Sequence, residues 1–143
     1  MSEARFVGLI LGAGRGKRLG KGPKAFVQLE DENLLERAFR VLGAAGVHEV
    51  VAVLPPEPDS GKVPEGLIVA RNATPETGPL HSAQLGLSKL DDSASVRGAV
   101  LYPVDHFRVQ VEDVSAVLNE ASSVDSEVSR VVPTLFGTGG HPI

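Results

Sequence analysis

Short apolar runs alternate with amphipathic segments along the chain. Four of the runs are rich in aliphatic and β-branched residues and end close to glycine, proline or polar positions, which is typical of buried strands. These runs cover residues 5–11, 47–54, 66–70 and 98–103. Strands that alternate with helices indicate parallel β-α units. The pattern therefore predicts an α/β fold, a three-layer α/β/α sandwich with a mostly parallel, Rossmann-like sheet.

Capping residues indicate where the predicted helices begin and end. Asn33 and Glu36 have the spacing of a capping box, and Gly46 suits the C-terminal cap of the same helix. Gly78 and Pro79 stand where the N-cap and first residue of a second helix are expected. The buried face predicted for that helix consists of Leu80, Ala83, Leu87 and Leu90. A third helix is expected from the spacing of Val111, Val114, Val117, Leu118 and Ala121.

Composition and charge narrow the class of protein. The 143 residues are 42% hydrophobic and 22% charged, as in an ordinary soluble domain. The chain has no cysteine, which excludes disulfides, thiolate metal sites and a cysteine nucleophile. A formal net charge of -4 and an aromatic content of 4% disfavour nucleic acid as a partner. No apolar run has the length of a membrane span, so we expect a cytoplasmic protein without a membrane partner.

The segment around the end of the first predicted strand has a charge opposite to that of the chain. Residues 9–24, LILGAGRGKRLGKGPK, contain five basic residues, five glycines and no acidic residue. Glycines let backbone N–H groups approach an anion closely. Arg18 offers a planar fork to phosphate oxygens, and Lys24 offers a point charge. The segment therefore predicts a site for a triphosphate. A solvated basic turn is the alternative, but five cations repel each other unless an anion is present.

Two common phosphate-binding motifs do not fit this segment. A Walker A loop would need glycine at Leu11 and serine or threonine at Arg18. A Rossmann fingerprint that starts at Gly12 would need glycine at Lys17. The pattern that remains is Gly-x-Gly-x-Gly-x-Arg-Leu-Gly, followed by Pro-Lys.

That pattern resembles the signature loop of GT-A-type nucleotidyltransferases, in particular the MobA-like group of molybdenum cofactor cytidylyl- and guanylyltransferases. The resemblance continues through ENLLERAFRVL, NATPETGPLHSAQLGL, PVDHF and GGHPI, and so covers nearly the whole chain. It implies a GT-A fold and transfer of a nucleotidyl group from CTP or GTP to a phosphorylated acceptor, such as a molybdopterin-type cofactor or a sugar phosphate. The nucleotide-binding residues that it implies are Leu11, Gly12, Ala13, Gly14, Arg15, Gly16, Arg18, Lys24, Asn72, Gly78 and Ser82.

Asp105 directly follows the apolar run AVLYPV. In an open parallel sheet, ligands bind beyond the carboxyl ends of the strands, so Asp105 and the basic loop should open on the same edge. A carboxylate facing a triphosphate is favourable if Mg²⁺ lies between them. The resemblance implies the same metal-binding role for Asp105. A turn-closing or capping aspartate is the alternative.

Several other polar residues are weaker candidates. Residues 78–84 begin a helix whose free N–H groups favour anions. A simple N-terminal cap without a ligand explains this stretch of sequence equally well. The family has two serines here near the ribose; Ser82 matches one, while His81 replaces the other. His106 is a candidate for contact with the acceptor, and Phe107 stands where the family usually has proline. His141 matches an acceptor-side block, and Asn72 matches a family position that by itself is a turn residue.

We expect one nucleotidyltransferase-like domain over residues 1–143, without the C-terminal part in which the family carries a second metal-binding aspartate. The predicted function is Mg²⁺-dependent nucleotidyl transfer, with Arg18, Lys24 and Asp105 as catalytic residues and pyrophosphate as a product. The alternative is a non-catalytic module of this fold that binds a nucleotide or a protein partner.

Overall fold

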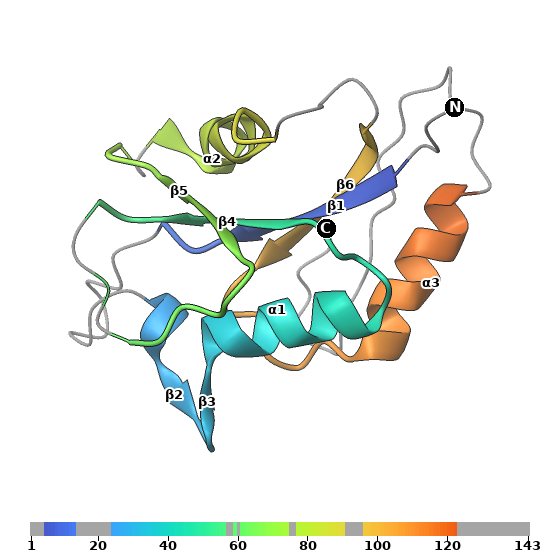
Figure 1. The fold of residues 1–143 in the computed structure, drawn as a ribbon, viewed down its shortest axis with the longest axis horizontal. Helices are drawn as coiled ribbons and strands as arrows, with labels where there is room; N and C mark the ends of the chain where they lie inside the picture. The colour runs from blue at the N-terminus through green and yellow to red at the C-terminus, as the bar shows by residue number, and fades with distance from the viewer. Residues whose placement is uncertain are drawn as a thin grey trace.

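A parallel sheet forms the centre of the molecule (Figure 1). The computed structural model describes residues 5–13, 24–56, 59, 61–74, 77–90 and 96–122. Within these residues the central sheet has four strands in the order β5-β4-β1-β6. The strands are β1 (Arg5–Leu11), β4 (Val50–Leu54), β5 (Ile68–Arg71) and β6 (Val96–Pro103).

Helices cover both faces of the sheet. Figure 1 shows α1 (Leu34–Ala44) and α3 (Val111–Ser122) on one face and α2 (Pro79–Leu87) on the other. Neighbouring residues of one strand serve the two cores: Ile10 packs in the core with α1 and α3, and Leu9 packs in the core with α2. This alternation follows from the two-residue period of a strand. The predicted three-layer α/β/α fold is confirmed.

Strand β4 shows why apolar runs predicted strands in this chain. All five residues of β4 are buried, because this strand has neighbours on both edges and helices on both faces. The continuous apolar run that predicted it is the sequence signature of such a strand. Burial of each large aliphatic side chain stabilises the fold by roughly 1.5–3 kcal/mol. The ends shift slightly: β4 starts at Val50 rather than Val47, and β6 starts at Val96 rather than Gly98.

Helix α1 begins at the predicted capping box. The Asn33 side chain accepts a hydrogen bond from the Glu36 amide at 2.7 Å, and the Glu36 carboxylate accepts one from the Asn33 amide at 2.9 Å. Gly46 follows the helix with φ +101°, a left-handed conformation that glycine adopts without strain. Both ends of α1 were therefore predicted from local sequence.

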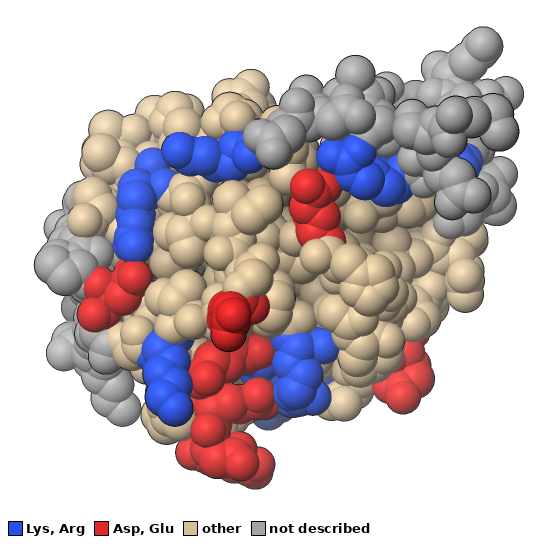
Figure 2. Space-filling model, in the orientation of Figure 1, with Lys and Arg blue, Asp and Glu red and all other residues tan. Residues whose placement is uncertain are grey.

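A small hairpin precedes α1 and was not predicted. Its strands are β2 (Gln28–Leu29) and β3 (Glu32–Asn33), and it follows the single-turn helix η1 (Lys24–Phe26). Two residues per strand are too few to produce a recognisable alternation. Figure 2 shows acidic side chains flanked by basic ones over this hairpin and α1.

One prediction about α2 was wrong. Ala83 and Leu90 are buried as expected, but the Leu80 side chain is 72% exposed. Leu80 lies in the first turn of the helix, and helical side chains point back towards the N-terminus. No earlier turn of α2 lies beside this side chain, which explains its exposure. No helix among the described residues has the length and apolar character needed to cross a membrane.

Candidate functional site

The predicted site residues that the structure describes lie at the carboxyl edge of the sheet. Because the four strands are parallel, their ends at Leu11, Leu54, Arg71 and Pro103 lie at one edge. The chain connects β1 to β4 on one side of it, whereas β6 pairs with the other side of β1. Such a reversal of strand order opens a crevice in which ligands bind in α/β proteins. The structure therefore places the candidate site between the ends of β1 and β6.

The root of the basic loop is tightly packed. Gly12 donates its amide hydrogen to the Val53 carbonyl at 2.9 Å, which continues the sheet one residue beyond β1. A Cβ atom at Gly12 would lie 3.3 Å from Leu54 Cδ2, so little space remains for a side chain. Ala13 is buried as well, whereas Leu11 is half-buried. Gly14, Arg15, Gly16 and Arg18 lie outside the described residues, and their contacts with phosphate stay predictions.

Lys24 and Asp105 form an ion pair at this edge of the sheet. Lys24 Nζ lies 3.1 Å from Asp105 Oδ2, although 81 positions separate the two residues in the chain. The two side chains are 44% and 45% exposed, so solvent reaches both. Buried Ala25 follows Lys24 and anchors η1 in the core beside the sheet. The structure therefore brings together two of the three predicted catalytic residues, while Arg18 lies outside the described part.

Asp105 offers chemistry suited to a magnesium ion. Its carboxylate is a hard oxygen donor at the edge where phosphates are expected, and Mg²⁺ typically takes one or two carboxylates together with phosphate oxygens. Within the described residues no group of three or more His, Cys, Asp or Glu could hold a metal by itself. The site therefore fits a metal that is bound jointly by Asp105 and a phosphate ligand.

Asn72 and Ser82 form a buried pair between the end of β5 and α2. Asn72 is fully buried directly after β5, and its amide Nδ2 donates to Ser82 Oγ in α2 at 2.9 Å. Its Oδ1 accepts a hydrogen bond from the Thr74 amide at 2.8 Å. The pair ties the end of β5 to the first turns of α2. The predicted nucleotide contacts of Asn72 and Ser82 stay predictions, and their present contacts are with each other.

Helix α2 presents its N-terminus at the same edge. Gly78 is the N-cap with φ +104°, Pro79 follows it, and no side chain of the described residues caps the first turn. Free N–H groups at such a terminus favour an anion. His81, which replaces a family serine, is half-buried in this turn. The geometry agrees with an anion site here, and the role of Gly78 stays a prediction.

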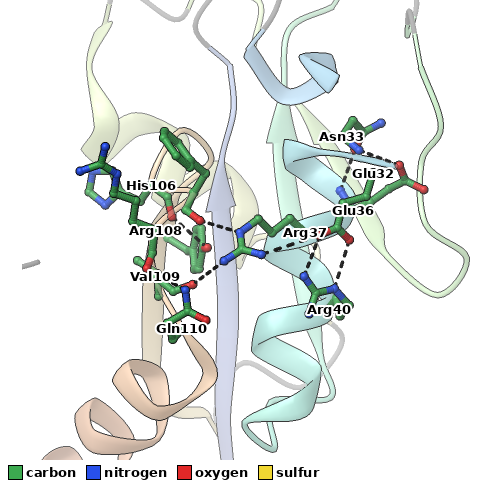
Figure 3. Close-up of polar contacts among 11 residues, drawn as sticks. Glu32, Asn33, Glu36, Arg37, Arg40, His106, Arg108, Val109 and Gln110 are labelled. Carbon is green, nitrogen blue, oxygen red and sulfur yellow. Dashed lines mark hydrogen bonds and ion pairs between the residues drawn. The ribbon is translucent and has the colours of Figure 1, made fainter. Parts of the chain in front are cut away.

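Two residues near the site were missed in the sequence. The Arg37 guanidinium, on α1, donates to the backbone carbonyls of Phe107 and Val109 in the loop that carries Asp105 (Figure 3). The buried Tyr102 hydroxyl donates to the His106 carbonyl at 3.1 Å. Burial raises the pKa of Tyr102 to about 12. Arg37 lies in the block ENLLERAFRVL and Tyr102 in the run AVLYPV, but both contact backbone carbonyls, which residue types do not reveal.

Two residues that depart from the family pattern, His106 and Phe107, lie in the loop after β6. His106 is half-buried and its amide donates to the Pro103 carbonyl in a turn after β6. Phe107 is 41% exposed, with the Arg108 guanidinium 5.6 Å from its ring centre. Contact of His106 with an acceptor stays a prediction. His141 lies outside the described residues.

Comparison with known proteins gives the family. Residues 8–143 match the model of the MobA-like NTP transferase domain. The chain belongs to the MobA-like NTP transferase family. The solved structure of Rv0371c from Mycobacterium tuberculosis has the same fold as this MobA-like chain, with a TM-score of 0.70 and 20% identity. That match covers 85% of this chain and 62% of Rv0371c.

Two curated relatives match shorter stretches of the MobA-like domain. Nicotine blue oxidoreductase of Paenarthrobacter nicotinovorans is 49% identical over 47 residues, which are 33% of this chain and 23% of that protein. The 2-C-methyl-D-erythritol 4-phosphate cytidylyltransferase of Deinococcus radiodurans is 50% identical over 54 residues, which are 38% of this chain and 23% of that protein. This chain therefore matches less than a quarter of the length of either relative.

Proposed function

We propose that this chain binds a nucleoside triphosphate with Mg²⁺ and transfers its nucleotidyl group to a phosphorylated small molecule. The observation that carries the proposal is the Lys24–Asp105 pair at the carboxyl edge of the sheet, in a chain of the MobA-like family. A cation and a carboxylate at 3.1 Å are the two groups needed to hold a phosphate and its counter-ion side by side. CTP or GTP as donor, and a molybdopterin-type or sugar phosphate as acceptor, are the finer parts of the proposal.

Each residue has a distinct task in the proposed reaction. Lys24 holds the α-phosphate through its ammonium group, and Arg18 holds the β- and γ-phosphates. Asp105 holds the magnesium ion, which neutralises negative charge on the phosphates when it is bound. An oxygen of the acceptor phosphate attacks the α-phosphorus in line, the bond to the β-phosphate oxygen breaks, and pyrophosphate leaves. Positioning and electrostatics carry most of such a reaction.

Relatives support this choice without deciding the substrate. One curated relative is named a cytidylyltransferase, and Rv0371c has also been solved as a complex with manganese, at 17% identity and a TM-score of 0.59. Another relative is named an oxidoreductase, so the domain type alone does not select nucleotidyl transfer. A cytoplasmic location stays a prediction.

The test measures pyrophosphate released by the purified chain with Mg²⁺, each NTP and candidate phosphorylated acceptors. We expect release above background, and a loss of about 100-fold or more in the Asp105→Asn variant, since a misplaced phosphate costs on that order. Asp31→Asn, at an exposed position in the turn between β2 and β3, is the control with the same change of charge. No release above the Asp105→Asn level with any acceptor would contradict the transfer step.

A second candidate is nucleotide binding without turnover. It is favoured by two departures from the family pattern near the site, His81 in place of a serine and Phe107 in place of a proline. Both candidates predict thermal stabilisation by CTP or GTP with Mg²⁺, about 2.7 kcal/mol at a concentration of 100 times Kd. NADH and NADPH are measured in parallel because of the oxidoreductase relative. Stabilisation by these dinucleotides alone would contradict both candidates.

A further inference from the structure

The loop between β6 and α3, residues 104–110, carries Asp105 and is held both by the buried side chains of Val104 and Val109 and by hydrogen bonds to its backbone. The Val104 amide donates to the Leu11 carbonyl at 3.0 Å and so attaches the loop to the end of β1. The Tyr102 hydroxyl donates to the His106 carbonyl. These contacts fix the first half of the loop from the sheet side.

Arg37 fixes the second half of the loop from α1. Its Nε donates to the Phe107 carbonyl at 2.6 Å, and its Nη2 donates to the Val109 carbonyl at 3.2 Å. Figure 3 shows the side chain extending from α1 to the loop, with both bonds on one guanidinium group. The planar fork of arginine suits two carbonyls at once, because its donors have a fixed relative geometry.

Arg37 itself is held in place. Its side chain is only 16% exposed, and its Nη1 lies 3.8 Å from Glu32 Oε1. Glu32 also accepts two hydrogen bonds from Arg40, at 2.7 and 3.1 Å. Hydrogen bonding to Arg40 lowers the pKa of Glu32, so this carboxylate stays charged beside Arg37. The hairpin residue Glu32 therefore orients an arginine that in turn holds the loop of the candidate site.

We propose that Arg37 is a positioning residue for Asp105. By holding the carbonyls two and four residues after Asp105, it fixes the backbone from which that carboxylate extends towards Lys24. The inference rests on the proposed function, because it assigns Arg37 to the binding of metal and triphosphate. Groups that orient a metal ligand typically change metal affinity or activity about 10–100-fold when removed.

Arg40 provides a matched control. It lies three residues further along α1 and pairs with the same Glu32, but no hydrogen bond between Arg40 and residues 104–110 occurs in the described part of the structure. Arg37→Met and Arg40→Met therefore both remove one arginine from α1 and one partner from Glu32. Arg37→Lys keeps the charge and loses the fork.

The first measurement is amide hydrogen exchange over residues 104–110 in the protein without ligand. We expect exchange at least tenfold faster in Arg37→Met than in the unaltered chain, an intermediate rate in Arg37→Lys, and no change in Arg40→Met. Equal exchange in Arg37→Met and Arg40→Met would overturn the inference. Since no nucleotide is present, this result does not depend on the proposed function.

The second measurement is the joint binding of Mn²⁺ and CTP or GTP, which is monitored by the electron paramagnetic resonance signal of the metal. We expect Arg37→Met to weaken joint binding on the order of tenfold and Arg40→Met to leave it unchanged. Thermal unfolding is recorded for each variant, so that loss of binding at unchanged stability separates positioning from general destabilisation. If the unaltered chain binds neither metal nor nucleotide, the proposed function fails and the assignment of Arg37 to that site fails with it. Faster exchange in Arg37→Met would then still establish that Arg37 holds the loop.

Discussion

Replacement of Asn72 by alanine tests whether the buried pair between the end of β5 and α2 stabilises the fold. The change removes the acceptor of the Thr74 amide at 2.8 Å and the donor to Ser82 Oγ at 2.9 Å. Asn72 is fully buried and Ser82 is 5% exposed, so water does not readily replace the partner that Ser82 loses, whereas Thr74 is exposed and can bond to water. Each lost hydrogen bond costs about 1 kcal/mol, and an unpaired buried group costs about 1–3 kcal/mol. We expect Asn72→Ala to lower the free energy of unfolding by about 2–4 kcal/mol.

Urea denaturation followed by far-ultraviolet circular dichroism measures this loss, since the chain has no tryptophan and only one tyrosine for fluorescence. Ser82→Ala leaves the Asn72 amide without its acceptor, and we expect a loss of about 1–3 kcal/mol. The double variant should lose about 0.5–1.5 kcal/mol less than the sum of the single variants, because one bond is counted twice.

Ser88→Ala is the control on the same stretch of chain. Ser88 is exposed and its Oγ donates to the Leu85 carbonyl one turn earlier, so its loss should stay within about 0.5 kcal/mol. If Asn72→Ala is as stable as Ser88→Ala, the buried hydrogen bonds do not have the value that their burial implies, and the reasoning is refuted.

Two further predictions concern a helix end and a buried phenol. Gly46→Ala should lower the free energy of unfolding by about 1–2 kcal/mol, because φ at this position is +101°. Gly43→Ala inside α1 should raise it by up to about 1 kcal/mol, because open space surrounds that position and alanine favours the helix. Thermal unfolding that showed the same sign for both variants would contradict this. Tyr102 has a folded pKa of about 12 against 10 for a free phenol, so the protonated form is favoured by folding and stability falls as the pH rises from 10 to 12, by at most about 1.4 kcal/mol per pH unit. Tyr102→Phe should show a smaller fall over this range in urea titrations, and an equal fall would assign it to other groups.

Local signals in the sequence explain which parts of the fold were predictable. The capping box at Asn33 and Glu36 needs only residues three apart, and the hydrogen bonds in the structure are the predicted ones. The run at β4 is apolar because both faces of that strand are covered. By contrast, Leu80 has the helical spacing of the buried residues but lies in the first turn of α2, where its side chain is exposed. The spacing of apolar residues does not show whether the first turn of a helix is covered.

The contacts around the candidate site depend on topology and on backbone, and the sequence carries less information about them. A parallel sheet predicts that Lys24 and Asp105 share an edge, yet their direct pairing depends on β6 lying beside β1 rather than beside β5. Arg37 binds carbonyls about 70 positions away, and a carbonyl is the same at every residue. No residue type at positions 107 and 109 could therefore have indicated this partner.

The exposure of the Lys24–Asp105 pair decides how it can serve a binding site. A buried ion pair is expensive to open, because separation leaves uncompensated charges that cost about 3–5 kcal/mol. A pair with both side chains nearly half exposed is worth only about 0.2–1 kcal/mol, since water solvates each partner once they separate. A phosphate that takes the place of Asp105 beside Lys24 makes a charge-assisted contact of at least comparable strength. The pair can therefore hold both side chains at the carboxyl edge of the sheet without competing strongly against a ligand, which makes it a suitable resting state for the proposed site.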